Sequence, residues 1–262
     1  METPLSSKCE NGQQLTAEQR PIFSVIMPAY NAETTIARAT TSVLSQTEPR
    51  FELIIINDGS SDNTQAIIDK LTKQDGRIVA ITLCHNLGVA TARNHGITRA
   101  SGRYIAFLDA DDYWLNDKLA EQLKLFKQGA QVVFSPYYRE KGQTRQLVSV
   151  PLTINYHTLL RGNCIGNLTG SYDAITIGKI YQKSVGHEDY LMWLDATKRG
   201  QVAYSTQRPT AVYTVSNASI SANKWRSALW TWKILRTQLN LPWHKAAFYF
   251  NAYLFNAIRK RY

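Results

Sequence analysis

The 262-residue sequence predicts an α/β fold, in which a mostly parallel sheet carries helices on both faces and a helical appendage follows at the C-terminus. Two observations predict it. Apolar, β-branched runs alternate with stretches of helical periodicity through the first half of the chain. These runs are apolar throughout, which is typical of strands covered on both faces. Hydrophobic residues make up 44% of the chain and charged residues 19%, which supports a sizeable core and excludes global disorder.

The predicted elements of the first half alternate strictly. Strands are expected at residues 23–27, 52–56, 78–83 and 104–108, and helices at 34–46, 63–73 and 88–100. Because right-handed crossovers make such strands run in one direction, their carboxyl ends should share one edge of the sheet. After residue 117 the pattern loosens. The expected elements there are a helix at 119–126, a strand at 131–135, a hairpin or loop at 137–150, short helices and loops from 159 to 200, strands within 202–215, and helices within 224–258 broken at Pro242.

The chain is expected to divide into a disordered tail (1–20), a main domain (21–221, with halves 21–117 and 118–221) and a C-terminal segment (222–262). The polar tail lacks the apolar stretch of a signal peptide. No apolar run reaches the roughly 20 residues of a spanning helix, which predicts a soluble or peripheral protein. Cys9, Cys84 and Cys164 lack metal-ligand spacing and are expected to be reduced thiols, as in the cytosol.

The net charge of +10 is unevenly distributed. No Asp or Glu follows Asp195, whereas 11 Lys and Arg do, so that residues 1–195 hold 19 basic and 20 acidic side chains. The C-terminal part is therefore strongly cationic. Such asymmetry predicts an anionic partner, which the charge alone leaves open between lipid headgroups, a phosphorylated substrate and nucleic acid.

Polar clusters follow three of the predicted strands. They are Pro28-Ala29-Tyr30-Asn31, Asn57-Asp58-Gly59-Ser60 and Asp109-Ala110-Asp111-Asp112. In open α/β sheets, ligands bind outside the carboxyl ends of the strands, so the three clusters should converge on one site.

The acidic cluster points to a metal. Asp109 and Asp111 can share one divalent cation, or divide between a cation and a ribose, and such hard oxygen ligands suit Mg²⁺ or Mn²⁺. The alternative, capping of the next helix, explains three neighbouring acids poorly, because they repel one another. Asp58 is a candidate for holding a base or ribose, although Asp-Gly is also an ordinary turn signal. Asn86 and Arg93 lie between the third and fourth strands, where Arg93 either counters a diphosphate, contacts the base or is a solvated cation.

These motifs, in this order and spacing, resemble family 2 glycosyltransferases. The resemblance is carried by Ser24-Val-Ile-Met-Pro-Ala-Tyr-Asn31, Asn57-Asp-Gly-Ser-Ser-Asp62 and Gly102-Arg-Tyr-Ile-Ala-Phe-Leu-Asp-Ala-Asp-Asp112, and it is dense over residues 22–135. It implies a glycosyltransferase A-type, Rossmann-like fold, a nucleotide-sugar donor such as a UDP-sugar, a divalent metal and inversion at the anomeric carbon. It also implies that Asp58 contacts the base, that Asp109 and Asp111 contact ribose and metal, and that Asp111 is the principal ligand. The half 21–117 would then bind the nucleotide-sugar donor and the half 118–221 the acceptor. The candidate donor contacts are Pro28, Ala29, Tyr30, Asn31, Asp58, Asn86, Arg93, Asp109, Ala110 and Asp111.

A second stretch, Gly186-His-Glu-Asp-Tyr-Leu-Met-Trp193, resembles the Glu-Asp element of the family and assigns the catalytic base to Asp189, beside Glu188. A positioned carboxylate suits this role, because an acceptor hydroxyl has a very high pKa. The pair also fits a helix N-terminus, where acids suit the helix dipole. Tyr213-Thr-Val-Ser216 replaces the Tyr-Arg-x-His of many relatives, and the Gln-x-x-Arg-Trp of processive synthases is absent. We therefore expect transfer of a single hexosyl or N-acetylhexosaminyl unit.

Residues 162–173, followed by Gly178-Lys179, resemble bacterial capsule and O-antigen assembly transferases. This resemblance implies an acceptor built on a polyprenyl diphosphate, at the cytoplasmic face of the inner membrane. The candidate acceptor or phosphate contacts are Asn167, Lys179, His187 and Trp193.

The C-terminal segment fits such a setting. Its apolar side chains recur at helical spacing on one face, at Trp225, Ala228, Leu229, Trp232, Leu235 and Leu239, and it ends in Arg259-Lys-Arg261. Aromatic residues beside cations are typical of the surface of an anionic membrane. The alternative is that this stripe packs on the main domain.

Other functions fit the sequence less well. Acidic clusters at the strand ends would repel nucleic acid, so we expect no nucleic-acid partner. A dinucleotide-dependent oxidoreductase or a methyltransferase would need a Gly-rich turn after the first strand, and Pro28-Ala-Tyr-Asn31 is not one. A catalytically silent nucleotide-sugar binding protein stays as the alternative.

Overall fold

The computed structural model describes residues 21–215 and 224–259. The predicted tail 1–20 lies outside the described residues. The strands are β1 Phe23–Ala29, β2 Phe51–Asn57, β3 Ile78–Thr82, β4 Tyr104–Phe107, β5 Tyr113–Trp114, β6 Val132–Phe134, β7 Tyr137–Lys141, β8 Thr144–Val148, β9 Thr153–Asn155, β10 Ser171–Asp173, β11 Val202–Ser205 and β12 Ala211–Thr214. The helices are α1 Ile36–Leu44, α2 Thr64–Gln74, α3 Val89–Arg99, α4 Lys118–Lys127, α5 Tyr156–Leu159, η1 Asn167–Thr169, α6 Glu188–Gly200, α7 Lys224–Lys233, η3 Ile234–Gln238 and α8 Trp243–Arg259.

The main sheet has the strand order β3-β2-β1-β4-β10-β6-β11-β9. Strand β1 pairs in parallel with β2 and β4, with Phe23 opposite Phe51 and Tyr104. Strand β10 is antiparallel to both β4 and β6, and β9 is antiparallel to β11, whereas β11 is parallel to β6. It follows that β1, β2, β3, β4, β6 and β11 all end at one edge, as the sequence predicts for the first four strands.

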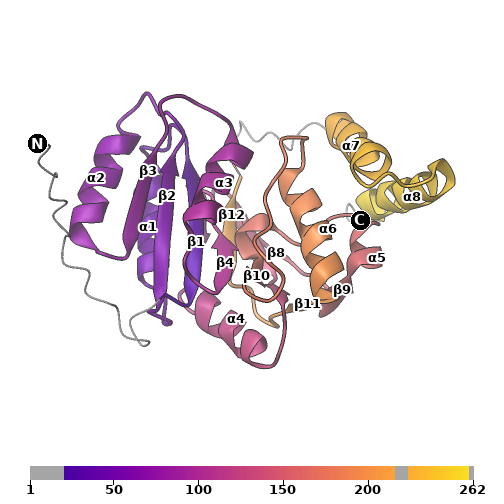
Figure 1. The fold of residues 1–262 in the computed structure, drawn as a ribbon, viewed down its shortest axis with the longest axis horizontal. Helices are drawn as coiled ribbons and strands as arrows, with labels where there is room; N and C mark the ends of the chain where they lie inside the picture. The colour runs from indigo at the N-terminus through magenta and orange to yellow at the C-terminus, as the bar shows by residue number, and fades with distance from the viewer. Residues whose placement is uncertain (1–20, 216–223, 260–262) are drawn as a thin grey trace, which may run out of the picture.

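Helices cover both faces of this sheet (Figure 1). Alternate residues of each strand belong to two separate cores, since side chains along a strand point to opposite faces. Ile26 belongs to the core that also contains Ile97 of α3 and the buried residues of α6, whereas Val25 belongs to the core that contains Val43 of α1 and the buried residues of α4. The predicted α/β fold with a mostly parallel sheet is therefore confirmed.

A smaller sheet with the order β5-β12-β7-β8 lies beside the acidic cluster. Strand β5 directly follows that cluster and pairs antiparallel with β12. Strands β7 and β8 form the predicted hairpin at residues 137–150.

Two elements differ from the prediction of short helices and loops between residues 159 and 200. Helix α6 is a regular helix of 13 residues, and β10 is a three-residue strand within the main sheet. Its pairing with β4 and β6 joins residues far apart in the chain, so no local pattern marks this strand.

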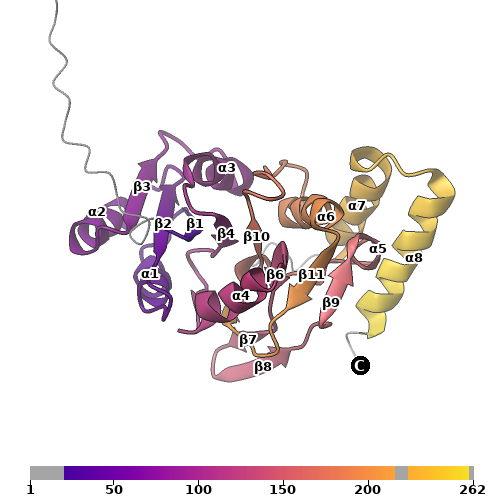
Figure 2. The same cartoon turned by 60° about the horizontal axis from the view of Figure 1, so that its bottom comes forward.

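The C-terminal helices α7, η3 and α8 pack against α6 and α5 at the end of the molecule opposite α2 (Figures 1 and 2). The helical path is broken at Pro242, as predicted. Ile234, Leu235 and Ala246 are fully buried in the core that contains α6. The predicted stripe is thus divided, because Trp225 and Leu229 are 85% and 68% exposed. None of the described helices is long and apolar enough to cross a membrane.

Candidate active site

The loops after β1 and β2 are joined by hydrogen bonds at the carboxyl edge of the sheet. The amide of Asn31 donates to Ser60 Oγ (3.0 Å), and Asn31 Oδ1 accepts from the amide of Ser61 (2.9 Å). Asn31 has a left-handed φ of 48°, a conformation that Asn tolerates well among residues with a side chain. Pro28 and Ala29 are buried at the end of β1, whereas Tyr30 is 51% exposed beside them. The first two predicted clusters therefore form one continuous rim.

Asp58 joins this rim to the loop after β3. Its carboxylate is buried and accepts hydrogen bonds from the amides of Leu87 (2.8 Å) and Gly88 (3.0 Å). Asn86 Oδ1 accepts a further bond from the amide of Gly88 (3.0 Å). Asp58 and Asn86, both predicted to bind the donor, thus also fix the loop that would surround it.

The acidic cluster after β4 concentrates negative charge. Asp112 is buried, and its Oδ1 accepts from the amide of Thr214 (2.8 Å) in β12. Burial, together with Asp109 and Asp111, raises the pKa of Asp112 to about 9. Asp111 lies at the rim, where the surrounding protein and Asp109 raise the pKa of its carboxyl group. Arg38 of α1 donates to the carbonyl oxygen of Asp111 (2.7 Å) and holds this turn.

The acidic cluster fits a divalent cation only with ligands from elsewhere. In the described parts of the chain, no group of three or more His, Cys, Asp and Glu side chains is placed to hold a metal. Asp109 and Asp111 supply hard carboxylate oxygens. Burial and, to a smaller extent, the negative charge of Asp109 raise the pKa of Asp111, and a bound cation would offset both effects. Mg²⁺ and Mn²⁺ commonly bind through one or two carboxylates, with substrate phosphates completing the shell. These two residues fit such a site.

Arg93 of α3 connects the acidic cluster with α6. Its Nη2 donates to Asp109 Oδ1 (2.6 Å) and its Nη1 to Gln182 Oε1 (3.0 Å). The guanidinium is buried, and its Nε has no partner among the described residues. Burial alone would lower the pKa of Arg93, but Asp109, with smaller contributions from Asp189 and Glu188, raises it. The alternative of a solvated helix cation is therefore wrong.

Asp189 lies in the first turn of α6, on the side of the site facing Arg93. Its Oδ2 accepts from Asn163 Nδ2 (3.2 Å). Burial raises the pKa of Asp189, against the opposing effects of Arg93 and His187. Glu188 Oε1 accepts from the amide of Gly186 (3.2 Å) and so closes the start of the helix. The predicted base and the predicted donor loops thus share one edge of the sheet.

Asn167 lies at this edge as well, because η1 precedes the antiparallel strand β10. Its side chain is only 9% exposed, and neither of its amide atoms has a hydrogen-bond partner in the described residues. His187, also an acceptor candidate, has a left-handed φ of 53° at the N-cap of α6.

Two of the acceptor candidates lie elsewhere, and these two assignments are corrected. Lys179 Nζ donates to the carbonyl oxygens of Thr98 (2.9 Å) and Ala100 (2.8 Å), so it caps the C-terminal end of α3 at the opposite edge of the sheet. Trp193 is fully buried in the core, where its ring packs edge-on against Phe107. Neither side chain is available to an acceptor at the carboxyl edge.

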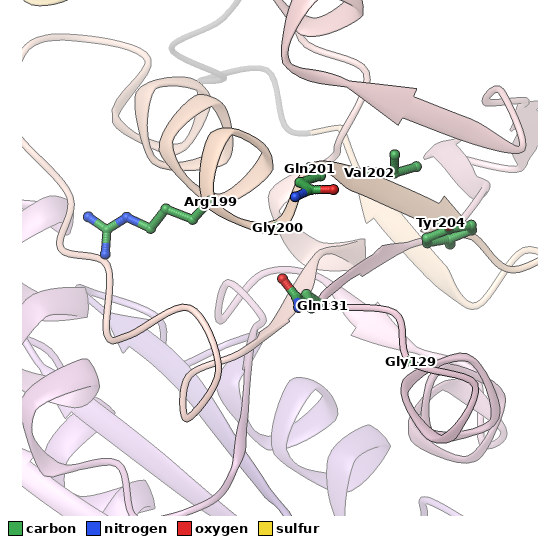
Figure 3. Close-up of a pocket in the computed structure, with 7 residues that line it drawn as sticks. All are labelled: Gly129, Gln131, Arg199, Gly200, Gln201, Val202 and Tyr204. Carbon is green, nitrogen blue, oxygen red and sulfur yellow. The ribbon is translucent and has the colours of Figure 1, made fainter.

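Two cavities of the structure lie away from the predicted site. A cavity of about 290 Å³ is lined by Gly129, Gln131, Arg199, Gly200, Gln201, Val202 and Tyr204 (Figure 3). It lies at the beginnings of β6 and β11, the edge opposite the carboxyl ends. A second cavity of about 300 Å³ lies between α6 and η3. None of the candidate site residues lines either cavity.

Three site residues were not predicted from the sequence. Gln182 holds Arg93, Asn163 holds Asp189, and Arg38 holds the turn of the acidic cluster. Asn163 lies within residues 162–173, whose resemblance to bacterial capsule and O-antigen assembly transferases is the one signal that pointed towards it. Gln182 and Arg38 have no local pattern, since their partners are 89 and 73 residues away in the chain.

Comparison with known proteins identifies the family of this chain. Residues 24–180 match the model of glycosyl transferase family 2. A Bacillus subtilis protein named as a teichuronic acid biosynthesis glycosyltransferase, TuaG, is 37% identical over 247 residues, covering 92% of this chain and 98% of its own. The Escherichia coli WfaP, a UDP-Glc:α-D-GlcNAc-diphosphoundecaprenol β-1,3-glucosyltransferase, is 36% identical over 219 residues, covering 82% of this chain and 86% of its own.

Solved structures show the same fold. That of Staphylococcus aureus TarS residues 1–349 with UDP-GlcNAc matches 88% of this chain and 71% of its own, with a TM-score of 0.69 and 20% identity. The mannosyltransferase PcManGT from Pyrobaculum calidifontis, with GDP-Man and Mn²⁺, covers 85% of this chain and 65% of its own, with a TM-score of 0.62 and 16% identity. The glycosyltransferase A-type fold is therefore common to all three.

Proposed function

Since this chain belongs to glycosyltransferase family 2, we propose that it is an inverting enzyme that transfers one glucose from UDP-glucose. The proposed acceptor is of the GlcNAc-diphosphoundecaprenol type. The reaction would serve the assembly of a bacterial surface polysaccharide such as O-antigen or capsule. The observation that carries the proposal is that one buried arginine, Arg93, is paired with Asp109 and also interacts electrostatically with the buried Asp189. UDP-glucose and the lipid-linked acceptor are the substrates of the Escherichia coli relative WfaP.

In the proposed reaction Asp189 is the general base. Its carboxylate takes the proton of the acceptor hydroxyl while the acceptor oxygen attacks the anomeric carbon. The new C–O bond forms as the bond to the UDP oxygen breaks, so the electron pair leaves with UDP and the anomeric centre inverts. Burial that raises the pKa of Asp189 makes it a stronger base than an ordinary surface aspartate, and Asn163 orients it.

The donor side is proposed to use the joined loops. Asp58 and the loop 86–88 would hold the uridine, and Arg93 would keep Asp109 in place. Asp109 and Asp111 would hold Mg²⁺ or Mn²⁺ together with the diphosphate, and the bound cation would supply positive charge that stabilises the departing UDP.

A lipid-linked acceptor places the reaction at a membrane surface. We propose a cytoplasmic protein that binds peripherally to the inner membrane through an outer face formed by Trp225, Leu229, Trp243, Phe248 and Phe255. These side chains are between 59% and 85% exposed and belong to a part of the chain without any Asp or Glu. Exposed aromatic residues with cations fit an anionic lipid surface.

The test is a transfer assay with UDP-glucose, Mn²⁺ and a synthetic GlcNAc-diphospholipid. We expect a glucosyl product whose new linkage is β by NMR, because inversion converts the α-linked donor. Asp189→Asn is the control and should give no appreciable product. Donor binding without transfer or hydrolysis in the wild type would instead identify a silent nucleotide-sugar binding protein. An α-linked product would contradict inversion.

A further inference from the structure

Trp230 of the C-terminal helix α7 contacts residues 186–187, the catalytic loop, which directly precedes Glu188 and Asp189. The indole lies directly over Gly186, so closely that a Cβ added to this glycine would lie 2.4 Å from Trp230 Cδ2. The ring centroids of Trp230 and His187 are 5.2 Å apart, with the planes almost perpendicular. The Arg226 guanidinium lies over the same indole, 4.6 Å from the ring centroid. Trp230 therefore fills the space between α7 and residues 186–187.

These two residues are held in an uncommon conformation. Gly186 and His187 have φ values of 75° and 53°, and both lie directly before Glu188 and Asp189. A left-handed conformation is unfavourable for a residue with a side chain and persists only where its surroundings hold it. The amide of Gly186 is bound by Glu188 from one side, and the indole covers the backbone from the other. The start of α6, and with it the carboxylate of Asp189, depends on this conformation.

We propose that Trp230 is a positioning residue: it holds the turn 186–187 in its left-handed form and thereby fixes the Asp189 carboxylate at the acceptor. The inference rests on the proposed function, in which Asp189 is the base. It also gives the C-terminal helices a part in catalysis, apart from any contact with lipid. A base displaced by about 1 Å loses on the order of 10²-fold in rate, so a small shift of this turn is sufficient.

The experiment compares Trp230→Ala with Trp232→Ala. Both remove an indole from α7, but Trp232 packs against Phe250 of α8 and not on the catalytic loop. With a water-soluble acceptor analogue, we expect Trp230→Ala to lower kcat by about 10- to 100-fold with little change in the KM for UDP-glucose. Trp232→Ala should lower the melting temperature but keep kcat near that of the wild type. Trp230→Phe, which keeps a flat ring over Gly186, should recover most of the activity.

A double-mutant cycle separates positioning from general damage. If Trp230 acts through Asp189, Trp230→Ala will have little further effect in an Asp189→Asn background, because effects of residues that act as a unit are not additive. The proposal would be overturned if Trp230→Ala lowered kcat by the same factor in the wild-type and Asp189→Asn backgrounds. It would also be overturned if Trp230→Ala and Trp232→Ala lowered kcat equally.

Amide hydrogen exchange gives a readout that needs no activity. We expect residues 185–190 to exchange faster in Trp230→Ala than in Trp232→Ala, because the turn loses its cover. Unchanged exchange would also refute the proposal. An inactive wild type with the predicted exchange pattern would refute the proposed function alone. Should Trp230→Ala fail to fold, Gly186→Ala tests the same contact from the other side, since the added methyl group collides with the indole.

Discussion

At the scale of single residues, Asp189 and Glu188 are adjacent acids with different surroundings. Asp189 is bound by Asn163 and faces Arg93, whereas Glu188 turns back to the amide of Gly186. We expect Asp189→Asn to lower transfer by about 10²–10⁴-fold with donor affinity nearly unchanged, since the amide keeps the shape but accepts no proton. Glu188→Gln should cost less, because an amide oxygen still accepts the same bond. Steady-state kinetics and donor titration of both variants test this. Near-normal turnover in Asp189→Asn would remove it as the base.

The pH dependence of turnover follows from the surroundings of Asp189. Burial raises the pKa of its carboxyl group, and the base must be ionised to act. Turnover should therefore fall as the pH drops through this raised pKa, at a higher pH than an exposed aspartate would give. The profile of kcat against pH measures it. An acid limb at or below the ordinary pKa of aspartate, about 3.9, would contradict a buried base.

The two acids predicted to bind metal differ in their partners. Asp109 is paired with Arg93, whereas the carboxylate of Asp111 lies at the rim with a raised pKa. Asp111→Ala should therefore reduce metal-dependent turnover more than Asp109→Ala does. Chelation should abolish turnover, and added Mn²⁺ or Mg²⁺ should restore it. Activity of the wild type in excess chelator would exclude a metal from the mechanism.

What the sequence reveals at this scale is limited by distance along the chain. Asp109 and Asp111 are recognisable because they are only two residues apart and follow a buried strand. Gln182 and Trp230 are not, because their importance comes from contacts made by folding. Trp193 and Lys179 show the reverse error. An aromatic residue and a cation near a motif were assigned to the acceptor, but one packs in the core and the other caps a helix.

At the scale of elements, the loops after β2 and β3 depend on one glycine. Gly59 has a φ of 68°, and a Cβ there would lie 2.5 Å from the carbonyl carbon of His85. Gly59→Ala must therefore separate the two loops that Asp58 joins. We expect a loss of about 1–3 kcal/mol in the free energy of unfolding and weaker binding of UDP-glucose.

Gly76→Ala is the matched control, because nothing lies within 4 Å of a Cβ at Gly76. Denaturant unfolding and calorimetric donor titration measure both variants. If Gly59→Ala and Gly76→Ala proved equally stable and bound UDP-glucose equally well, these loops would not act as one unit.

The elements predicted from the sequence are those with a strong local pattern. The buried strands β1 to β4 and the helices between them were predicted within two residues at each end, because their apolar runs and periodicity are strong. Strand β10 was not predicted, since three residues carry no periodicity and its place between β4 and β6 is set by long-range pairing. The sequence also did not predict which side chains of α7 pack on the main domain and which are exposed, because periodicity alone does not distinguish the two.

At the scale of the whole molecule, the C-terminal helices combine packing with exposure. Tyr249 Oη is 3.2 Å from His157 Nδ1, and Asn256 Nδ2 donates to the carbonyl oxygen of Arg161, so α8 is bound to the main domain. The same helix also carries Trp243, Phe248 and Phe255, which are 71%, 59% and 66% exposed. Deleting the helix would therefore uncover the core around Ala246 as well as remove the outer face. Substitutions confined to the exposed side chains are the better test of membrane binding.

We expect the triple variant Trp243→Ser, Phe248→Ser, Phe255→Ser to lose most binding to vesicles that contain anionic lipid, while it folds and transfers sugar to a water-soluble acceptor as the wild type does. Ile175→Ser is the control, because Ile175 is 76% exposed but belongs to the main domain.

Binding of the wild type should decrease in high salt without vanishing, since cations contribute about 1 kcal/mol each near an anionic surface and the apolar contribution is not screened. Vesicle sedimentation at low and high salt measures these effects. Equal sedimentation of the triple variant and the wild type would show that lipid is bound elsewhere. Complete loss of wild-type binding in high salt would show that the aromatic residues do not contribute to membrane binding.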